Sequence, residues 1–345
     1  MTVRWGVIGA GGIADRRTIP EGIMKARDTK LVAVMDVNER QARAVAEKYG
    51  CEAHSSEEEL LSRNDVDVVY IATPNYLHYQ QVIRSLEAGK HVLCEKPLSL
   101  TLQEAEAMIE KAEELGLVLA VGFMMRFHAY HQKIKEMIDK GELGDPVLGR
   151  AQLTCWYPDI PGAWRQIAEL GGGGALMDMG SHCIDLLEMF MGRVAEVSAF
   201  NSTLTHKYEV EDSSLVMLRF ESGALGIVDN NFNIPDASAL NILEVYGTCG
   251  SVEARGTIGQ SSFGKMVARI EENMEGYEAS QTRGASVEEE VTVDPVNIYQ
   301  AEIEDVNSAI RGKRKPANPG ERGFWNLKVI LAAYQSAREG RVISI

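Results

Sequence analysis

The sequence predicts an α/β protein in which a doubly wound parallel sheet is followed by a mainly antiparallel sheet with a few helices. The chain has 345 residues, a length that suggests about two domains. Residues 1–122 alternate apolar strands with helices, which is typical of a parallel sheet covered on both faces. After Gly122 the alternation stops, so we expect a second domain over 123–345, with late helices that pack back on the first.

The first domain is expected to contain short, continuously apolar strands. The helices between them carry apolar residues at helical spacing, and Thr101 with Glu104 forms a capping-box pattern before one of them. We place the strands at 3–8, 31–36, 67–72, 91–94 and 118–121, and helices at 40–49 and 102–115.

The second domain is expected to be built from hairpins and a few helices. A glycine-rich break at 171–174 precedes a helix at 175–191, and turn residues separate strand pairs further on. A polar, acidic stretch at 273–288 is expected to be an exposed loop. We place a helix at 128–140, strands at 147–155, 214–220, 225–231, 243–246 and 251–254, and late helices around 299–310 and 327–334.

Composition narrows the possible partners and the cellular compartment. The chain carries 35 basic and 50 acidic residues, a net charge of −15, which argues against binding to a nucleic acid. No apolar run reaches the length of a membrane span, and the first residues read as a strand rather than a signal peptide. The five scattered cysteines have no CxxC spacing and fit a reducing compartment, so we expect a cytoplasmic protein.

A glycine-rich turn follows the first predicted strand. Gly9 permits a tight turn, Gly11 lets the backbone approach a pyrophosphate, and the small Ala14 lets the helix pack on the strand. The same letters could form a turn without a ligand, but the position between strand and helix favours a dinucleotide site. We expect this site to use Gly9, Gly11, Gly12, Ile13 and Ala14.

Asp36 ends the second strand, where a carboxylate can accept hydrogen bonds from a ribose. It lies 27 residues after Gly9, more than the usual roughly 20, and a longer first helix and loop containing Pro20 would explain the spacing. A carboxylate repels a 2′-phosphate, so NAD is favoured over NADP. Arg40 leaves the choice open, since its cation could reach a phosphate or stack on adenine.

Polar residues follow two further strands at the sheet edge where open α/β sheets bind ligands. Thr73, Pro74 and Asn75 follow one strand, with His78 a turn later, and the proline ends that strand. Glu95-Lys96-Pro97 follows the strand 91–94, which places a lysine ammonium at the same edge.

Asp178, His182 and Asp185 recur at i, i+4 and i+7 and would share one face of a helix. One reading is a metal site, for which such oxygen and nitrogen ligands would suit Zn or Mn. The other is acid–base chemistry. His182 would take a hydroxyl proton, Lys96 would stabilise the alkoxide, and Asp178 would orient the lysine or a substrate hydroxyl. We favour the second reading and expect no metal.

These motifs together resemble the glucose–fructose oxidoreductase, inositol dehydrogenase and rhizopine-catabolism family, called Gfo/Idh/MocA, over essentially the whole chain. The resemblance rests on residues 9–14, Ala72-Thr73-Pro74-Asn75 with His78, Glu95-Lys96-Pro97, Trp164-Arg165, and 174–182 followed by Asp185. It implies an N-terminal Rossmann domain and a C-terminal domain with a large open sheet through which members form dimers or tetramers.

The resemblance also implies an NAD(P)-dependent oxidoreductase acting on a secondary alcohol or ketone of a sugar, sugar derivative or cyclitol. It implies catalytic roles for Lys96, Asp178 and His182, and places Arg126, Trp164 and Arg165 near the nicotinamide. Tyr157, with Arg165, is expected to line the substrate pocket. Two alternatives are an NAD-dependent glycoside hydrolase that oxidises C3 transiently, and a non-catalytic sugar- or nucleotide-sensing regulator.

Overall fold

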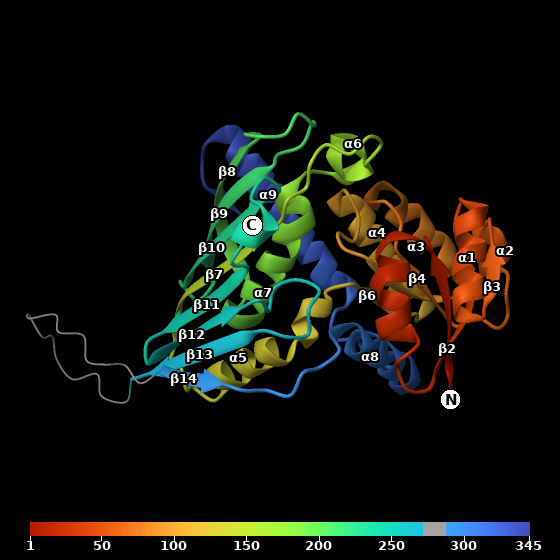
Figure 1. Cartoon of the computed structure of the whole chain (residues 1–345), viewed down its shortest axis with the longest axis horizontal. Coiled ribbons are helices and arrows are strands. Elements are labelled where there is room, and N and C mark those ends of the chain that lie inside the picture. The colour runs from red at the N-terminus through yellow and green to blue at the C-terminus, as the bar shows by residue number, and fades with distance from the viewer. Residues whose placement is uncertain (272–287) are drawn as a thin grey trace, which may run out of the picture. The chain divides into compact units, whose positions relative to one another are not determined.

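A computed structural model gives the fold of the chain and describes residues 1–271 and 288–345 (Figure 1). The expected acidic loop at 273–288 therefore lies outside the described residues, apart from Glu288. Among the described residues, no helix is both long enough and apolar enough to cross a bilayer.

Two compact units make up the chain, and each is assembled from segments distant in sequence. Unit 1 comprises Met1–Met124, Ala163–Gly172 and Asn297–Lys328. Unit 2 comprises Met125–Gly162, Gly173–Val296 and Val329–Ile345. The division of function at residue 122 stays a prediction.

Unit 1 contains a six-stranded, wholly parallel sheet, which confirms the predicted doubly wound architecture. Its order is β3-β2-β1-β4-β5-β6, so the order reverses between β1 and β4. In sheets of this type, ligands bind at the carboxyl ends of the strands beside such a reversal. The strands are β1 Val3–Ile8, β2 Thr29–Met35, β3 Glu52–His54, β4 Val68–Ile71, β5 His91–Cys94 and β6 Leu119–Val121.

The helices of unit 1 follow the expected pattern, with one difference. The predicted first helix is present as η1, Ala14–Ile23, but it is a π-helix with Pro20 inside it. Thr101 and Glu104 form the predicted capping box at the start of α4. The other helices are α1 Glu39–Tyr49, α2 Glu57–Leu61, η2 Asn75–Leu77, α3 His78–Glu87, α4 Leu102–Leu115, η4 Trp164–Gln166, α6 Ala168–Gly171 and α8 Ile298–Gly312.

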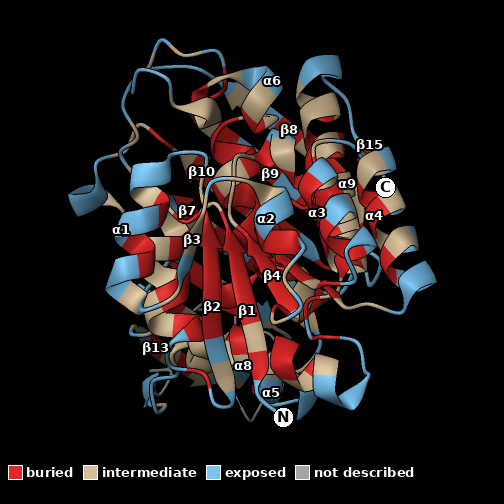
Figure 2. Cartoon of the chain, turned by 90° about the vertical axis from the view of Figure 1, so that its right-hand side faces the viewer, coloured by how far each residue is buried: buried red, intermediate tan, exposed pale blue. Residues whose placement is uncertain are grey.

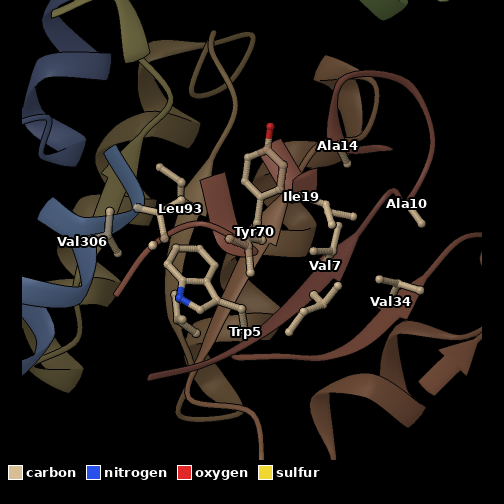
Figure 3. Close-up of a cluster of buried hydrophobic side chains, with 14 of the residues drawn as sticks. Trp5, Val7, Ala10, Ala14, Ile19, Val34, Tyr70, Leu93 and Val306 are labelled. Carbon is tan, nitrogen blue, oxygen red and sulfur yellow. The ribbon is translucent and has the colours of Figure 1, made fainter. Parts of the chain in front are cut away.

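A buried apolar cluster joins the sheet of unit 1 to α8. Trp5, Tyr70 and Leu93 from three strands lie in one cluster with Val306 of α8 (Figure 3). The indole Nε1 of Trp5 donates a hydrogen bond of 3.0 Å to Oδ1 of Asn307. The central strands β1, β2 and β4 are buried along most of their length (Figure 2), which explains their continuous apolar runs.

Unit 2 contains a nine-stranded sheet of order β14-β13-β12-β11-β7-β10-β9-β8-β15. Only β7 and β10 pair in parallel within this described sheet, which confirms the expected antiparallel character. The strands are β7 Pro146–Thr154, β8 Val194–Ser202, β9 Ser213–Phe220, β10 Leu225–Asn231, β11 Ile242–Gly247, β12 Gly250–Arg255, β13 Lys265–Ile270, β14 Glu288–Val291 and β15 Ile343–Ser344.

One face of the nine-stranded sheet is covered by helices (Figure 1). A Cβ atom at Gly149 in β7 would lie 2.9 Å from the Leu187 side chain of α7, so glycine allows the helix to approach the strand closely. The next residue, Arg150, faces the other side of the sheet, where it lies near Asp229 and Glu244 on the neighbouring strands. The remaining helices are η3 Met124–Phe127, α5 Ala129–Asp139, η5 Leu176–Gly180, α7 Ser181–Met191, η6 Asp236–Ser238 and α9 Gly320–Glu339, and both η3 and α9 run from unit 1 into unit 2.

Candidate active site

Two glycines of the loop after β1 have a positive φ, a conformation that favours glycine. Gly9 has a φ of +86°, and a Cβ atom there would lie 2.8 Å from the Ala72 carbonyl oxygen. Gly12 has a φ of +53°, and its Cβ atom would meet nothing within 4 Å. The first glycine is therefore required by the protein's own packing. At Gly12 open space lies beside the backbone that leads into η1, and helix N-termini are positions where proteins can bind phosphate groups.

Asp36 is tied to this glycine loop. Its Oδ2 accepts a hydrogen bond of 3.3 Å from the Gly11 backbone N–H, and its Oδ1 accepts one of 2.9 Å from the Asn38 N–H. The π-helix η1 and the turn after it supply the extra length between Gly9 and Asp36, as the spacing predicted. Arg40, in the first turn of α1, is exposed, and its side chain makes no hydrogen bond or ion pair within the described part of the chain.

His78 connects the loops that follow β4 and β5. Its ring is fully buried, with Nδ1 2.8 Å from the Pro97 carbonyl oxygen and Nε2 3.0 Å from the Thr73 carbonyl oxygen. Burial lowers the pKa of this imidazole; the two carbonyl groups oppose that change, and the cations of Lys96 and Arg165 add to it. His78 therefore lies between the loop carrying Lys96 and the loop carrying Thr73, with one ring nitrogen against a carbonyl oxygen of each.

Asn75 holds a second segment of unit 1. Its side chain, only 7% exposed, donates a hydrogen bond of 2.8 Å to the Gly171 carbonyl oxygen. The segment 163–172 carries Trp164 and Arg165, and the Arg165 guanidinium lies 4.2 Å from the centre of the Trp164 ring. Pro74 precedes Asn75 and starts the short helix η2.

Glu95 directly precedes Lys96, and its carboxylate is hydrogen-bonded to a residue of the buried sheet of unit 1. The Tyr70 hydroxyl donates to Glu95 Oε1 at 2.5 Å and accepts from the Thr18 hydroxyl at 2.9 Å. Burial raises the pKa of the Glu95 carboxyl, although Tyr70 and the cations of Lys96 and Arg165 oppose this. Lys96, Glu95, His78 and Arg165 therefore lie close enough to act on one another electrostatically.

Asp178 and His182 lie on consecutive helical segments of unit 2. Asp178 belongs to the π-helical turn η5, and His182 lies in the first turn of α7. Short π-helical turns occur often at functional sites. Asp178 is half-buried. The pKa of the thiol of Cys155, the residue that follows β7, is raised to about 12, mainly by burial of the thiol and next by the negative charge of Asp178. Asp178 thus lies near the carboxyl end of β7.

Asp185 was expected to share one helix face with Asp178 and His182, but its carboxylate is bound to Arg126. Its carboxylate is 1% exposed and accepts hydrogen bonds of 2.9 and 2.8 Å from the Arg126 Nε, while Arg126 Nη2 donates to the Asp185 carbonyl oxygen at 2.9 Å. The π-helical turn also breaks the regular 3.6-residue spacing between Asp178 and Asp185. Asp185 therefore holds Arg126, and this engagement disfavours the reading in which it binds a metal with His182.

Tyr157 lies just beyond β7 on the same unit as Asp178. Its backbone N–H donates to the Phe232 carbonyl oxygen at 2.8 Å, and its ring is 5.0 Å from the Phe232 ring. Its carbonyl oxygen accepts a hydrogen bond of 3.1 Å from the Tyr208 hydroxyl. These contacts hold Tyr157 beside Phe232, the residue that follows β10.

The expected site residues form two groups, one on each unit. The residues on unit 1 are Gly9, Gly11, Gly12, Ile13, Ala14, Asp36, Arg40, Thr73, Pro74, Asn75, His78, Glu95, Lys96, Trp164 and Arg165. Those on unit 2 are Arg126, Tyr157, Asp178 and His182.

Two supporting residues had no signal strong enough to find them in the sequence. Tyr70 lies in an apolar strand and gave no sign that its hydroxyl joins Glu95 to Thr18. Glu211 contacts the glycine-rich segment before η5, although 37 residues separate it from Gly174. Only the three-dimensional structure connects residues so far apart in sequence.

Two family models match the chain. The model described as "Oxidoreductase family, NAD-binding Rossmann fold" of Gfo/Idh/MocA matches residues 3–123. The model described as "GFO/IDH/MocA C-terminal domain" matches residues 131–253.

Curated relatives and solved structures extend over the whole chain. A 1,5-anhydro-D-fructose reductase of Ensifer adhaerens is 33% identical, with 99% of this chain and 98% of that protein covered. A D-xylose 1-dehydrogenase (NADP(+)) of Haloferax volcanii is 29% identical, with 99% of each covered. The crystal structure of an aldose–aldose oxidoreductase from Caulobacter crescentus with glycerol is 27% identical, covers 100% of both chains and has a TM-score of 0.89.

Proposed function

Because the chain belongs to the Gfo/Idh/MocA family of NAD(P)-binding Rossmann-fold oxidoreductases, we propose that it transfers a hydride between nicotinamide and a secondary alcohol or ketone of a sugar, sugar derivative or cyclitol. The observation that carries this proposal is the position of Lys96 at the carboxyl end of β5, on the sheet edge that also bears the glycine loop and Asp36. We further propose that residues 1–122 serve the cofactor and 123–345 the substrate and oligomer.

The catalytic residues are Lys96, His182 and Asp178. When bound, the nicotinamide accepts the hydride in the direction of oxidation and supplies it in the direction of reduction. His182 removes the hydroxyl proton during oxidation, because an imidazole is suited to proton transfer near neutral pH. The Lys96 ammonium donates a hydrogen bond to the same oxygen and stabilises its developing negative charge. Asp178 orients Lys96 or a neighbouring substrate hydroxyl.

The cofactor is NAD rather than NADP. The fixed Asp36 carboxylate supports this choice, since it can accept from the ribose hydroxyls and would repel a 2′-phosphate. The NADP(+)-named relative from Haloferax shows that the family fold does not decide the question. The proposed cofactor residues are Gly9, Gly11, Gly12, Ile13, Ala14, Asp36, Arg40, Thr73, Pro74, Asn75, His78, Glu95, Lys96, Arg126, Trp164 and Arg165.

The substrate is a small polyhydroxylated molecule. Tyr157 and Arg165 supply donors and an aromatic edge for its hydroxyl groups, alongside Lys96, Asp178 and His182. The named relatives act on a sugar ketone and an aldose, which supports this class without choosing a member of it.

The chain acts as a homodimer or homotetramer in the cytoplasm. The uncovered face of the nine-stranded sheet would form the contact, since Leu215 and Met217 are exposed there next to the ion pairs of Arg150. The five free cysteines support a reducing compartment. Light scattering of the intact chain measures the oligomeric state.

The direct test is a spectrophotometric screen for NADH formation. The purified chain is mixed with NAD and, separately, with myo-inositol, D-xylose, D-glucose and methyl β-D-glucoside, and NADH oxidation is followed with the corresponding ketones. We expect turnover with at least one compound, and a loss of about a thousandfold in Lys96→Ala with NADH binding retained. Near wild-type turnover in that variant would defeat the assignment, and glycoside cleavage without accumulating NADH would favour the hydrolase alternative.

A further inference from the structure

Glu211 accepts hydrogen bonds from the backbone N–H groups at the start of the helical segment that carries Asp178 and His182. Its carboxylate accepts hydrogen bonds from the Gly174 N–H at 3.0 and 3.1 Å and from the Leu176 N–H at 3.0 Å. Its carbonyl oxygen accepts from the Ala175 N–H at 3.1 Å. Three consecutive N–H groups thus go to one residue. Groups of this kind have no partner inside a helix and must find one elsewhere.

Tyr334 of α9 holds the same carboxylate from another direction. Its hydroxyl donates to Glu211 Oε1 at 2.7 Å. Glu211 is only 9% exposed, and burial raises the pKa of its carboxyl, whereas the four hydrogen bonds to its oxygens oppose that rise. A buried carboxylate that accepts this many bonds fixes its donors closely.

The glycines of this segment are required because Glu211 and Tyr334 lie so close to it. A Cβ atom at Gly174 would lie 1.9 Å from the Glu211 carbonyl oxygen, and one at Gly173 would lie 2.0 Å from the Tyr334 hydroxyl. No side chain fits at either position. The break at 171–174, which the sequence predicted as a glycine-rich segment before a helix, is in its second half a site of close packing against Glu211 and Tyr334.

The fixed segment leads directly into the proposed catalytic residues. The Gly174 carbonyl oxygen accepts the Asp178 backbone N–H at 2.9 Å, so the first helical turn starts at the residue that Glu211 holds. We infer that Glu211, with Tyr334, is a positioning residue that sets where the η5–α7 helix begins and thereby where Asp178 and His182 stand relative to the reacting hydroxyl. This inference rests on the proposed function for its kinetic consequence, but not for its structural one.

The kinetic test uses Glu211→Gln in the full-length chain. An amide keeps the size of the side chain but presents an NH2 group where two oxygens now accept N–H donors. We expect kcat for the best compound of the screen to fall about 10- to 100-fold, because small misplacements of catalytic groups cost that much. The KM for NAD and the affinity for NADH should stay unchanged, and the primary deuterium isotope effect on kcat should rise as hydride transfer becomes rate-limiting.

The structural test is hydrogen–deuterium exchange of peptides that contain residues 174–180. We expect faster exchange in Glu211→Gln and a smaller change of the same kind in Tyr334→Phe, which removes one donor and no charge. Asp67→Asn is the matched control: Asp67 also accepts several bonds, from Arg4, but it lies just before β4 at the opposite end of that strand from the loop carrying Thr73. It should leave both the exchange at 174–180 and kcat unchanged.

Two results would overturn the inference. One is unchanged exchange at 174–180 in both Glu211→Gln and Tyr334→Phe. The other is faster exchange with wild-type kcat, which would make Glu211 important for stability alone. If the wild-type chain turns over no compound in the screen, the proposed function fails, while the exchange experiment still decides whether Glu211 fixes the segment. If Glu211→Gln does not fold, Tyr334→Phe carries both measurements.

Discussion

Gly9 and Gly12 lie three residues apart in the loop after β1, yet they need to be glycine for different reasons. At Gly9 both the positive φ and the Ala72 carbonyl group exclude a side chain. At Gly12 only the positive φ opposes one, because the space beside it is open. The sequence identified both glycines and predicted a tight turn at Gly9, but it did not show that the Ala72 carbonyl group leaves no room for a side chain there.

This difference predicts opposite outcomes for two alanine variants. Gly9→Ala should lower the free energy of unfolding by about 2 kcal/mol or more, through strain and a backbone clash. Gly12→Ala should cost only about 1 kcal/mol and should instead weaken NADH binding, because its methyl group occupies the space left for the cofactor. Thermal unfolding and NADH fluorescence titration measure the two effects. Equal stability losses with unchanged NADH affinity in Gly12→Ala would contradict this account of the loop.

Asp36 should decide the choice of cofactor. Asp36→Ala removes an acceptor for the ribose hydroxyls and should weaken NAD binding about 10- to 100-fold, as expected for the loss of hydrogen bonds to a charged group. The use of NADP should improve at the same time, because Arg40 remains near and nothing repels the 2′-phosphate. Adding Arg40→Ala should remove that gain. The ratio of kcat/KM for the two cofactors is the measurement, and a wild-type chain that already prefers NADP would refute the assignment.

At the scale of the elements, the long apolar strands and capped helices were predictable, and the short or irregular ones were not. Thr101 with Glu104 gave the start of α4 from local chemistry alone. The strand β3 was missed because Glu52–His54 is three residues long and is not apolar. The π-helical turns η1 and η5 were missed because no residue pattern separates them from an α-helix.

Asp67, just before β4, should make a contribution to the stability of the chain that depends on pH. Burial raises the pKa of its carboxyl, but the hydrogen bonds and the cation of Arg4 outweigh this effect and hold the pKa below its usual value. A carboxyl with a lowered pKa in the folded state contributes stability above its unfolded pKa of about 3.9 and loses that contribution as the pH falls through the folded value.

Asp67→Asn should therefore destabilise the chain by about 1 kcal/mol near neutral pH. The difference in unfolding free energy between wild type and variant should shrink as the pH falls below about 4. Glu39→Gln, which removes an exposed partner of Arg43, should have almost no effect at any pH. Denaturant unfolding across this pH range measures both variants, and a constant difference down to the lowest pH would show that Asp67 stabilises by packing and not by its charge.

For the whole molecule, the sequence predicted a first domain over 1–122 and a second over 123–345, with late helices that pack back on the first, and each compact unit is assembled from separate segments of the chain. The segments Ala163–Gly172 and Asn297–Lys328 belong to unit 1. Of these, α8 joins unit 1 through Val306 and through Asn307, which bonds to Trp5. Periodicity showed that this helix has an apolar face, but the expectation that late helices pack back on the first domain did not identify the residues that this face contacts. The proposed site residues were named from motifs, while the hydrogen bonds that hold several of them could not be predicted from the sequence.

The central proposal is that Lys96 and His182 act on the same hydroxyl group. A double-mutant cycle measures this directly, with kcat/KM determined for Lys96→Ala, His182→Ala and the double variant, and with NADH binding confirmed in each. Groups that act together in one transition state give strongly non-additive losses. We therefore predict that the double variant is about as slow as the slower single variant, and losses that multiply would contradict the claim.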